Sequence, residues 1–220
     1  MKKNLILICA VALMSMTSFH KKIKIVFFGD SITMLGINKG GYINKIQDTI
    51  NAKGLQNKYE LIGAGVSANK VYDLYLRIDD DVIAKKPNIV VVYVGINDVW
   101  HKTFGTGTDI EKYEKFYEAI IKKLQAQKAK LILCTPSVIG EKKNNANAQD
   151  ADLNAYADVV RKLAEKYSCD LVDLHKIFTD YENEYNINDV EKGILTVDKV
   201  HLTDKGNRLV ADEIIKKLNL

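Results

Sequence analysis

The stretch Ile89-Val90-Val91-Val92-Tyr93-Val94 is an uninterrupted apolar run. A strand with one face in water alternates apolar and polar residues, whereas a strand covered on both faces has no such alternation. This stretch therefore predicts a central strand of a parallel sheet that carries helices on both sides.

The rest of the chain alternates between short apolar runs and segments with helical spacing. Apolar residues recur at helical spacing within residues 113–124, 153–167 and 204–218, and Thr203 is a candidate N-cap for the last of these. Strands that alternate with helices predict an α/β fold, a three-layer α/β/α sandwich around a flavodoxin-like five-stranded parallel sheet. The other four strand-like runs are Ile23–Phe28, Tyr59–Ile62, Leu131–Cys134 and Leu171–Leu174.

The first residues differ from the rest of the chain. A short basic start, residues 1–4, precedes the apolar run Leu5 to Met14, which is too short to span a bilayer. This pattern indicates a signal peptide over residues 1–18, followed by one domain over residues 19–220, and hence a secreted or periplasmic protein. An uncleaved anchor is the alternative, and the mature protein is expected to have no membrane span.

Composition narrows the possible functions. A net charge of +4 in 220 residues, with lysines scattered among acids, gives no basis for nucleic-acid binding. Cys134 ends one predicted strand and Cys169 falls just before another, so the two lie at opposite ends of the sheet, separated by roughly 17 Å for a five-residue strand. Two free, buried thiols are therefore expected. Oligomeric state is not readable from the sequence.

A serine follows the first predicted strand in Gly29-Asp30-Ser31. Ligands collect outside the carboxyl ends of parallel strands, so a hydroxyl placed there is a candidate nucleophile. A serine after a strand is also a common helix N-cap, and that alternative stays open at this point. A nucleophilic serine needs a base, a group that orients the base, and donors for the oxyanion.

A candidate base and its orienting acid lie near the end of the chain, at Asp198 and His201. Three residues apart on a tight turn, the carboxylate can accept from one ring nitrogen and leave the other free to take a proton. A surface pair that caps the last helix is the alternative. The other histidines are weaker candidates: His20 adjoins the leader, and His175 has no acid three residues upstream.

Two further turns after strands offer oxyanion donors. Asn97, in Gly95-Ile96-Asn97-Asp98, carries a side-chain amide, and the small-residue turn Gly63–Asn69 carries backbone N–H groups. An Asx turn and a plain strand-to-helix turn, respectively, are the structural alternatives.

Together these blocks resemble the SGNH (GDSL) esterase and lipase family, over roughly residues 24–218. Gly29-Asp30-Ser31-Ile32-Thr33, Gly95-Ile96-Asn97-Asp98 and Asp198 to His201 are similar to three of the family's four blocks. The resemblance implies a three-layer fold, no metal and no cofactor, and ester hydrolysis through an acyl-enzyme. Ser31 would be the nucleophile, His201 the general acid and base, and Asp198 the orienting carboxylate. The Ser31 N–H and the Asn97 amide would be oxyanion donors.

The remaining block departs from the family pattern. Family members usually have glycine at the position of Ala68, which still offers its N–H; Gly65 is the alternative donor. An alanine there would be strained if the position requires a positive φ. The rival glycine–x–serine–x–glycine pattern is absent, because Gly65-Val66-Ser67-Ala68-Asn69 fails at its last position.

The expected function is a serine esterase acting on acyl esters with short chains, and carbohydrate O-acetyl esters are the leading substrate class. The polar loops over residues 99–109 and 137–150 lack a long apolar stretch that could cover a long acyl chain. Trp100 and Phe104 in the first loop are candidate substrate contacts, or simply residues packed beneath that loop. A lysophospholipase or arylesterase, transfer of the acyl group to a sugar hydroxyl, and a non-catalytic glycan-binding protein remain alternatives.

Overall fold

A computed structural model describes residues 21–220 and contains a five-stranded parallel sheet in the order β2-β1-β3-β4-β5. This order confirms the predicted flavodoxin-like arrangement. The predicted signal peptide, like His20, lies outside the described residues. The strands are β1 (Ile23–Gly29), β2 (Tyr59–Gly65), β3 (Ile89–Tyr93), β4 (Lys130–Cys134) and β5 (Asp170–Val172).

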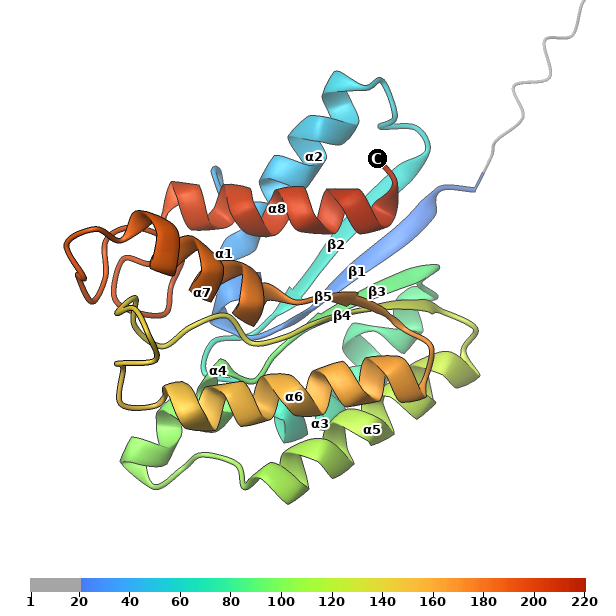
Figure 1. The fold of residues 1–220 in the computed structure, drawn as a ribbon. Coiled ribbons are helices and arrows are strands. Elements are labelled where there is room, and N and C mark those ends of the chain that lie inside the picture. The colour runs from blue at the N-terminus through green and yellow to red at the C-terminus, as the bar shows by residue number, and fades with distance from the viewer. Residues whose placement is uncertain (1–20) are drawn as a thin grey trace, which may run out of the picture.

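Helices cover both faces of this sheet, which confirms the three-layer architecture (Figure 1). The helices α3, α5 and α6 lie on one face, and α2 and α8 lie on the other with α1 and α7. Their bounds are α1 (Ser31–Gly36), α2 (Tyr42–Ala52), α3 (Val71–Asp81), α4 (Ile96–Trp100), α5 (Ile110–Ala126), α6 (Asp150–Lys166), α7 (Leu174–Tyr185) and α8 (Asp204–Leu218), with 3₁₀ turns η1 (Ile83–Lys85) and η2 (His101–Phe104).

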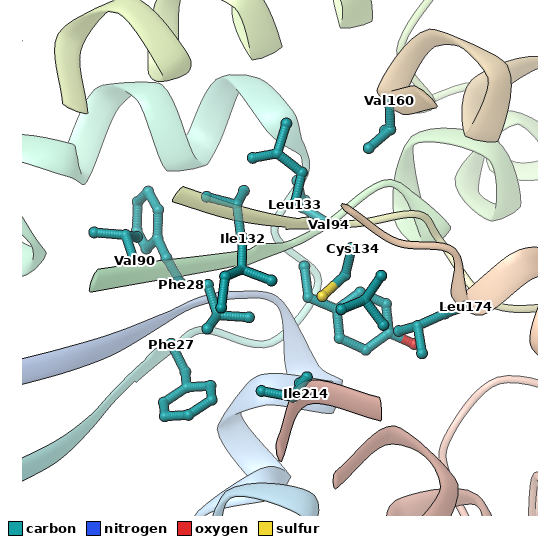
Figure 2. Close-up of a cluster of buried hydrophobic side chains, with 14 of the residues drawn as sticks. Phe27, Phe28, Val90, Val94, Ile132, Leu133, Cys134, Val160, Leu174 and Ile214 are labelled. Atoms are coloured by element: carbon teal, nitrogen blue, oxygen red, sulfur yellow. The ribbon is translucent and has the colours of Figure 1, made fainter. Parts of the chain in front are cut away.

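Alternate residues of β1 face opposite helical layers, as the period of a strand requires. The Phe27 ring packs edge-on against Tyr42 of α2, at 5.8 Å between centroids, whereas Phe28 lies beneath the Arg77 guanidinium of α3. Figure 2 shows the same division farther along the sheet, with Ile214 on the side of Phe27 and Val160 on the other. The run Ile89–Val94 is buried almost throughout, as its lack of polar residues predicts.

The last strand is shorter than the run Leu171–Leu174 predicts, and that boundary was wrong. β5 ends at Val172, because the Asp173 side chain accepts the Lys176 N–H and starts α7 at Leu174. An apolar run does not distinguish a strand from the buried first turn of a helix. At the other end of the chain, Thr203 Oγ1 accepts the Gly206 N–H at 3.1 Å, which confirms it as the N-cap of α8.

Both cysteines described above are free thiols, as predicted. Cys134 is fully buried, but Cys169 is only half-buried, so the expected burial was wrong for Cys169. Cys169 precedes β5 at the edge of the sheet, where one side of the strand has no neighbour. Burial, with a smaller contribution from Asp170, raises the pKa of the Cys169 thiol to about 11. Within residues 21–220, no helix combines the length and apolar character needed to cross a membrane.

Candidate active site

Ser31 is the first residue of α1 and lies directly past the carboxyl end of β1. The N-cap is Asp30, whose Oδ1 accepts the Ile32 N–H at 3.0 Å. The capping alternative for Ser31 is therefore wrong, and its hydroxyl is free for another partner. The turn is tight: a Cβ on Gly29 would lie 2.3 Å from Thr33 Oγ1 and from the Tyr93 carbonyl.

The structure brings together Ser31 and His201, which are 170 residues apart in the chain. Ser31 Oγ lies 3.0 Å from His201 Nε2, and His201 Nδ1 lies 2.7 Å from Asp198 Oδ2. Since Nδ1 donates its hydrogen to the carboxylate, Nε2 is left to accept the serine proton. These distances are within the hydrogen-bond range that general-base activation of a serine requires.

Asp198 is held by backbone groups of its own turn. Its Oδ1 accepts the N–H groups of Val200 at 3.1 Å and His201 at 2.8 Å. Burial alone would raise the pKa of the Asp198 carboxyl, but the hydrogen bonds from the His201 ring and from these N–H groups outweigh burial and lower the pKa. The carboxylate therefore stays ionised where it can stabilise a protonated imidazole.

Asn97 lies in the first turn of α4, buried beside the turn that follows β2. Its Nδ2 donates one hydrogen to the Asn69 carbonyl at 3.0 Å. An amide nitrogen carries two hydrogens, so a second remains for a ligand. The Asx-turn alternative is not what the structure shows, because this bond crosses to a different turn and joins the two predicted donor segments.

The two alternatives for the backbone donor, Gly65 and Ala68, lie in different surroundings. Gly65 is the last residue of β2 and pairs with Gly29, and a Cβ there would lie 2.1 Å from the Met34 N atom. Close packing against α1 therefore explains this glycine. Ala68 lies in the exposed turn beyond the strand, with φ at +61°. A non-glycine residue in that left-handed region is strained.

We expect Ala68→Gly to stabilise the fold by about 0.5–1 kcal/mol, because it removes this backbone strain. The N–H is retained, so esterase activity should stay within about twofold of the parent. Ser67→Gly is the matched control in the same turn, and it should destabilise, because Ser67 does not have a positive φ. Urea unfolding measures both; a loss of stability in Ala68→Gly would contradict the strain argument.

The two predicted substrate residues have different surroundings. The Trp100 ring lies 6.5 Å from the His201 ring, centroid to centroid, in an edge-on arrangement. Trp100 also borders a cavity of about 360 Å³ whose lining includes Lys142, Gln149 and Lys199. Phe104 is 68 % exposed and packs on His101. The structure therefore places Trp100, but not Phe104, beside the candidate catalytic residues.

Two residues that support the site were missed by sequence analysis. Arg77 of α3 donates to the Gly29 carbonyl at 2.8 Å, the Ala64 carbonyl at 3.0 Å and the Asn69 Oδ1 atom at 2.7 Å. It therefore ties the end of β1 to the turn that carries Ala68. No sequence signal marks it, since an arginine on an amphipathic helix is usually a solvated residue.

The second is Asp98, which is fully buried and accepts the Val71 N–H at the start of α3. Burial raises the pKa of its carboxyl to about 6. Its position at the end of the Gly95–Asp98 block is the sequence feature that could have indicated a role for Asp98 in the site. Asp30 behaves similarly: burial raises the pKa of its carboxyl to about 7, against the lowering effect of the Ile32 N–H.

The remaining described histidines have other roles. His175 is buried, and its Nδ1 atom lies 2.7 Å from the Ser137 carbonyl. His101, at the start of η2, has its ring tilted against Trp100 and edge-on to Phe104. Neither is placed against Ser31. His101 does have an acid three residues upstream, Asp98, but that carboxyl is buried and accepts the Val71 N–H instead.

Comparison of the sequence with models of known protein families identifies the family of this chain. The model of the GDSL-like lipase/acylhydrolase family matches residues 27–209, most of the chain. The chain belongs to this family. The fold agrees with that of similar solved structures, and the protein is a carboxylic ester hydrolase.

Individual relatives in the comparisons include acetylxylan esterases. This GDSL-like chain is 28 % identical over 212 residues to an acetylxylan esterase of Geobacillus stearothermophilus, covering 89 % of this chain and 93 % of the other. Among solved structures, the acetyl xylan esterase AlAXEase is 54 % identical with a TM-score of 0.88, covering 89 % of this chain and all of that one. An α/β hydrolase enzyme from the metagenome of Lake Arreo, Spain, is 28 % identical with a TM-score of 0.79, covering 89 % and 94 %.

Proposed function

We propose that this GDSL-like hydrolase removes acetyl groups from acetylated carbohydrate. The observation that carries the catalytic part of the proposal is the chain of contacts from Ser31 Oγ through the His201 ring to Asp198. The substrate class is supported by the relatives named acetylxylan esterases, one of them more than half identical to this chain.

In the proposed reaction, Ser31 Oγ attacks the acetyl carbonyl carbon while its proton passes to His201 Nε2. The carbonyl oxygen becomes an oxyanion, which the Ser31 and Ala68 N–H groups and the second Asn97 amide hydrogen stabilise. Collapse breaks the bond to the sugar oxygen, which takes the proton from His201. Water then attacks the acetyl-enzyme with His201 as base, releasing acetate and restoring Ser31.

The position of His201 indicates where the sugar binds. A general acid must reach the leaving oxygen, so the alcohol part of the ester lies on the His201 side of Ser31. Trp100 and its cavity are on that side. An aromatic face suits the C–H face of a sugar ring, and the polar lining suits its hydroxyls. We therefore assign this cavity to the carbohydrate.

A panel of esters tests the substrate class. The purified protein is assayed for acetate release from acetylated xylo-oligosaccharides, and for hydrolysis of p-nitrophenyl esters from acetate to decanoate. We expect activity on the acetylated sugar and a steep fall with acyl length. A preference for long chains would indicate a lipase or lysophospholipase instead. Binding of the sugar with no turnover of any ester would indicate a glycan-binding protein.

Replacing Trp100 tests the assignment of the cavity. Trp100→Ala should lower kcat/KM for acetylated xylo-oligosaccharides about tenfold more than for vinyl acetate, whose leaving group is too small to reach the cavity. Phe104→Ala is the matched control on the same segment and should affect both substrates equally. A pH-stat records acetic acid release from both. Equal losses for the two esters in Trp100→Ala would contradict the assignment.

We also propose that the enzyme is exported. Support comes from the basic start, the short apolar run and the small polar residues within residues 1–18. Fractionation of cells that express the full chain, with N-terminal sequencing of the product, tests this. A product that stays in the cytoplasm with Met1 intact would contradict it.

A further inference from the structure

Glu141 is a fully buried carboxylate between β4 and α6 that the proposed reaction does not use. Its Oε2 accepts the Ile194 N–H at 3.0 Å, and its Oε1 accepts the Leu195 N–H at 3.0 Å. Oε1 also accepts the backbone N–H and the side-chain hydroxyl of Thr196. One side chain therefore holds the backbone N–H groups of three consecutive residues, and bonds of this kind to a carboxylate are stronger than neutral ones.

The segment held by Glu141 leads directly into the turn that carries Asp198 and His201. Thr196 forms an antiparallel bridge with Leu202, and the Val197 N–H donates to the His201 carbonyl at 2.8 Å. Asp198 and His201 therefore lie on a small loop that the Thr196–Leu202 bridge closes. Glu141 binds this closed end of the loop, through Thr196.

The neighbour of Glu141 binds the same loop from its tip. The Gly140 N–H donates to the Lys199 carbonyl at 2.9 Å. Gly140 has φ at +101°, and a Cβ there would lie 2.2 Å from Asn147 Oδ1, so this contact requires glycine. Gly140 thus holds the tip of the loop, at Lys199, and Glu141 holds its closed end, at Thr196. Ser31 belongs to a different segment, at the end of β1.

We propose that Glu141 is a positioning residue: it sets the place of the Asp198–His201 loop relative to Ser31, and so governs the rate of acyl transfer rather than the binding of the ester. The role is distinct from that of the triad, because Glu141 touches neither the reacting atoms nor His201. The proposal rests on the proposed function. A displacement of about 1 Å between serine and imidazole costs on the order of a hundredfold in rate.

A second buried carboxyl provides a matched control. Glu182 of α7 is 2 % exposed, and no partner in residues 21–220 hydrogen-bonds its Oε1 atom. Burial, followed by the nearby Glu141 and Asp150, raises the pKa of the Glu182 carboxyl to about 9. Glu182 is thus an acid of the same kind in the same region, with no hydrogen bond to the loop of Asp198 and His201.

The test compares Glu141→Gln, Thr196→Val and Glu182→Gln in the full chain. For p-nitrophenyl acetate, Glu141→Gln should lower kcat about a hundredfold with KM within about twofold, because an amide cannot accept at both positions. Thr196→Val keeps the carboxylate and removes one donor, so it should lose about tenfold in kcat and still fold if Glu141→Gln does not. Glu182→Gln should retain kcat within about twofold.

A second measurement does not depend on turnover. The proton that His201 Nδ1 shares with Asp198 should give a far-downfield NMR resonance in the parent protein, assigned by its loss in His201→Gln. It should move or broaden in Glu141→Gln and stay unchanged in Glu182→Gln. An unchanged resonance and unchanged kcat in Glu141→Gln would overturn the proposal. A parent enzyme inactive on every ester would contradict the proposed function alone, because the resonance still reports the loop.

Discussion

Ser31→Ala should lower kcat on acetate esters by about four to six orders of magnitude, because the triad residues act as a unit. The change removes only Oγ, the atom 3.0 Å from His201 Nε2. Because Asp30, and not Ser31, caps α1, the helix and the thermal stability should be unaffected. Initial rates with p-nitrophenyl acetate and a thermal melt measure the two quantities.

Ser137→Ala is the control for that experiment. Ser137 is also a buried serine, and its Oγ accepts the Tyr93 hydroxyl at 2.8 Å. Its loss leaves the Tyr93 hydroxyl without this partner, so stability should fall by about 1–3 kcal/mol while kcat remains close to that of the parent. If Ser31→Ala kept more than about one hundredth of the parental kcat, Ser31 would not be the nucleophile.

Asp198→Asn should lower kcat by about ten-thousandfold, because the substitution favours the wrong imidazole tautomer. The Asp198 Oδ1 position accepts two backbone N–H groups, and the amide oxygen of an asparagine would take that place. The amide nitrogen would then face His201 Nδ1 as a donor. This arrangement places the ring hydrogen on Nε2, which can no longer accept the proton of Ser31.

The comparison for this substitution is Asp204→Asn, an exposed acid three residues beyond His201. Asp204 pairs with Lys45 and has no hydrogen bond to the imidazole, so its replacement should leave kcat intact. The measurement is kcat and KM of both variants on p-nitrophenyl acetate. Comparable rates in Asp198→Asn and Asp204→Asn would show that the proposed carboxylate does not orient the base.

The sequence predicted the sheet well because strand and helix patterns are local. Runs such as Ile23–Phe28 lie within a residue of the strand found. Two boundaries were wrong: β2 runs on to Gly65, three residues past the predicted Tyr59–Ile62, and β5 is shortened by a cap at Asp173 that an apolar run does not reveal. The triad candidates were also readable, since Asp198 and His201 share one turn. Their meeting with Ser31 could not be derived from the sheet, because Asp198 and His201 lie between α7 and α8 and follow no strand; it was implied by the resemblance to the family.

What the sequence did not reveal are contacts between irregular segments. Glu141 lies in a loop without periodicity, and its partners are 53 to 55 residues farther along the chain. Arg77 has helical surroundings on a partly exposed face, so only the structure shows that it binds two strand ends and Asn69. Such bonds depend on which segments meet in space. Neither the helical spacing around Arg77 nor the sequence around Glu141 indicates which segment each side chain contacts.

The separation of Ser31 from His201 has a consequence for the order of events in biosynthesis. A ribosome delivers the end of β1 well before the Asp198–His201 loop. Helix α8 must then dock on α2, where Asn207 accepts the Tyr42 N–H. A nascent or prematurely terminated polypeptide therefore carries a serine with no base. Hydrolytic competence arises only once the Asp198–His201 loop and α8 have been synthesised, so polypeptides that end before them are inactive.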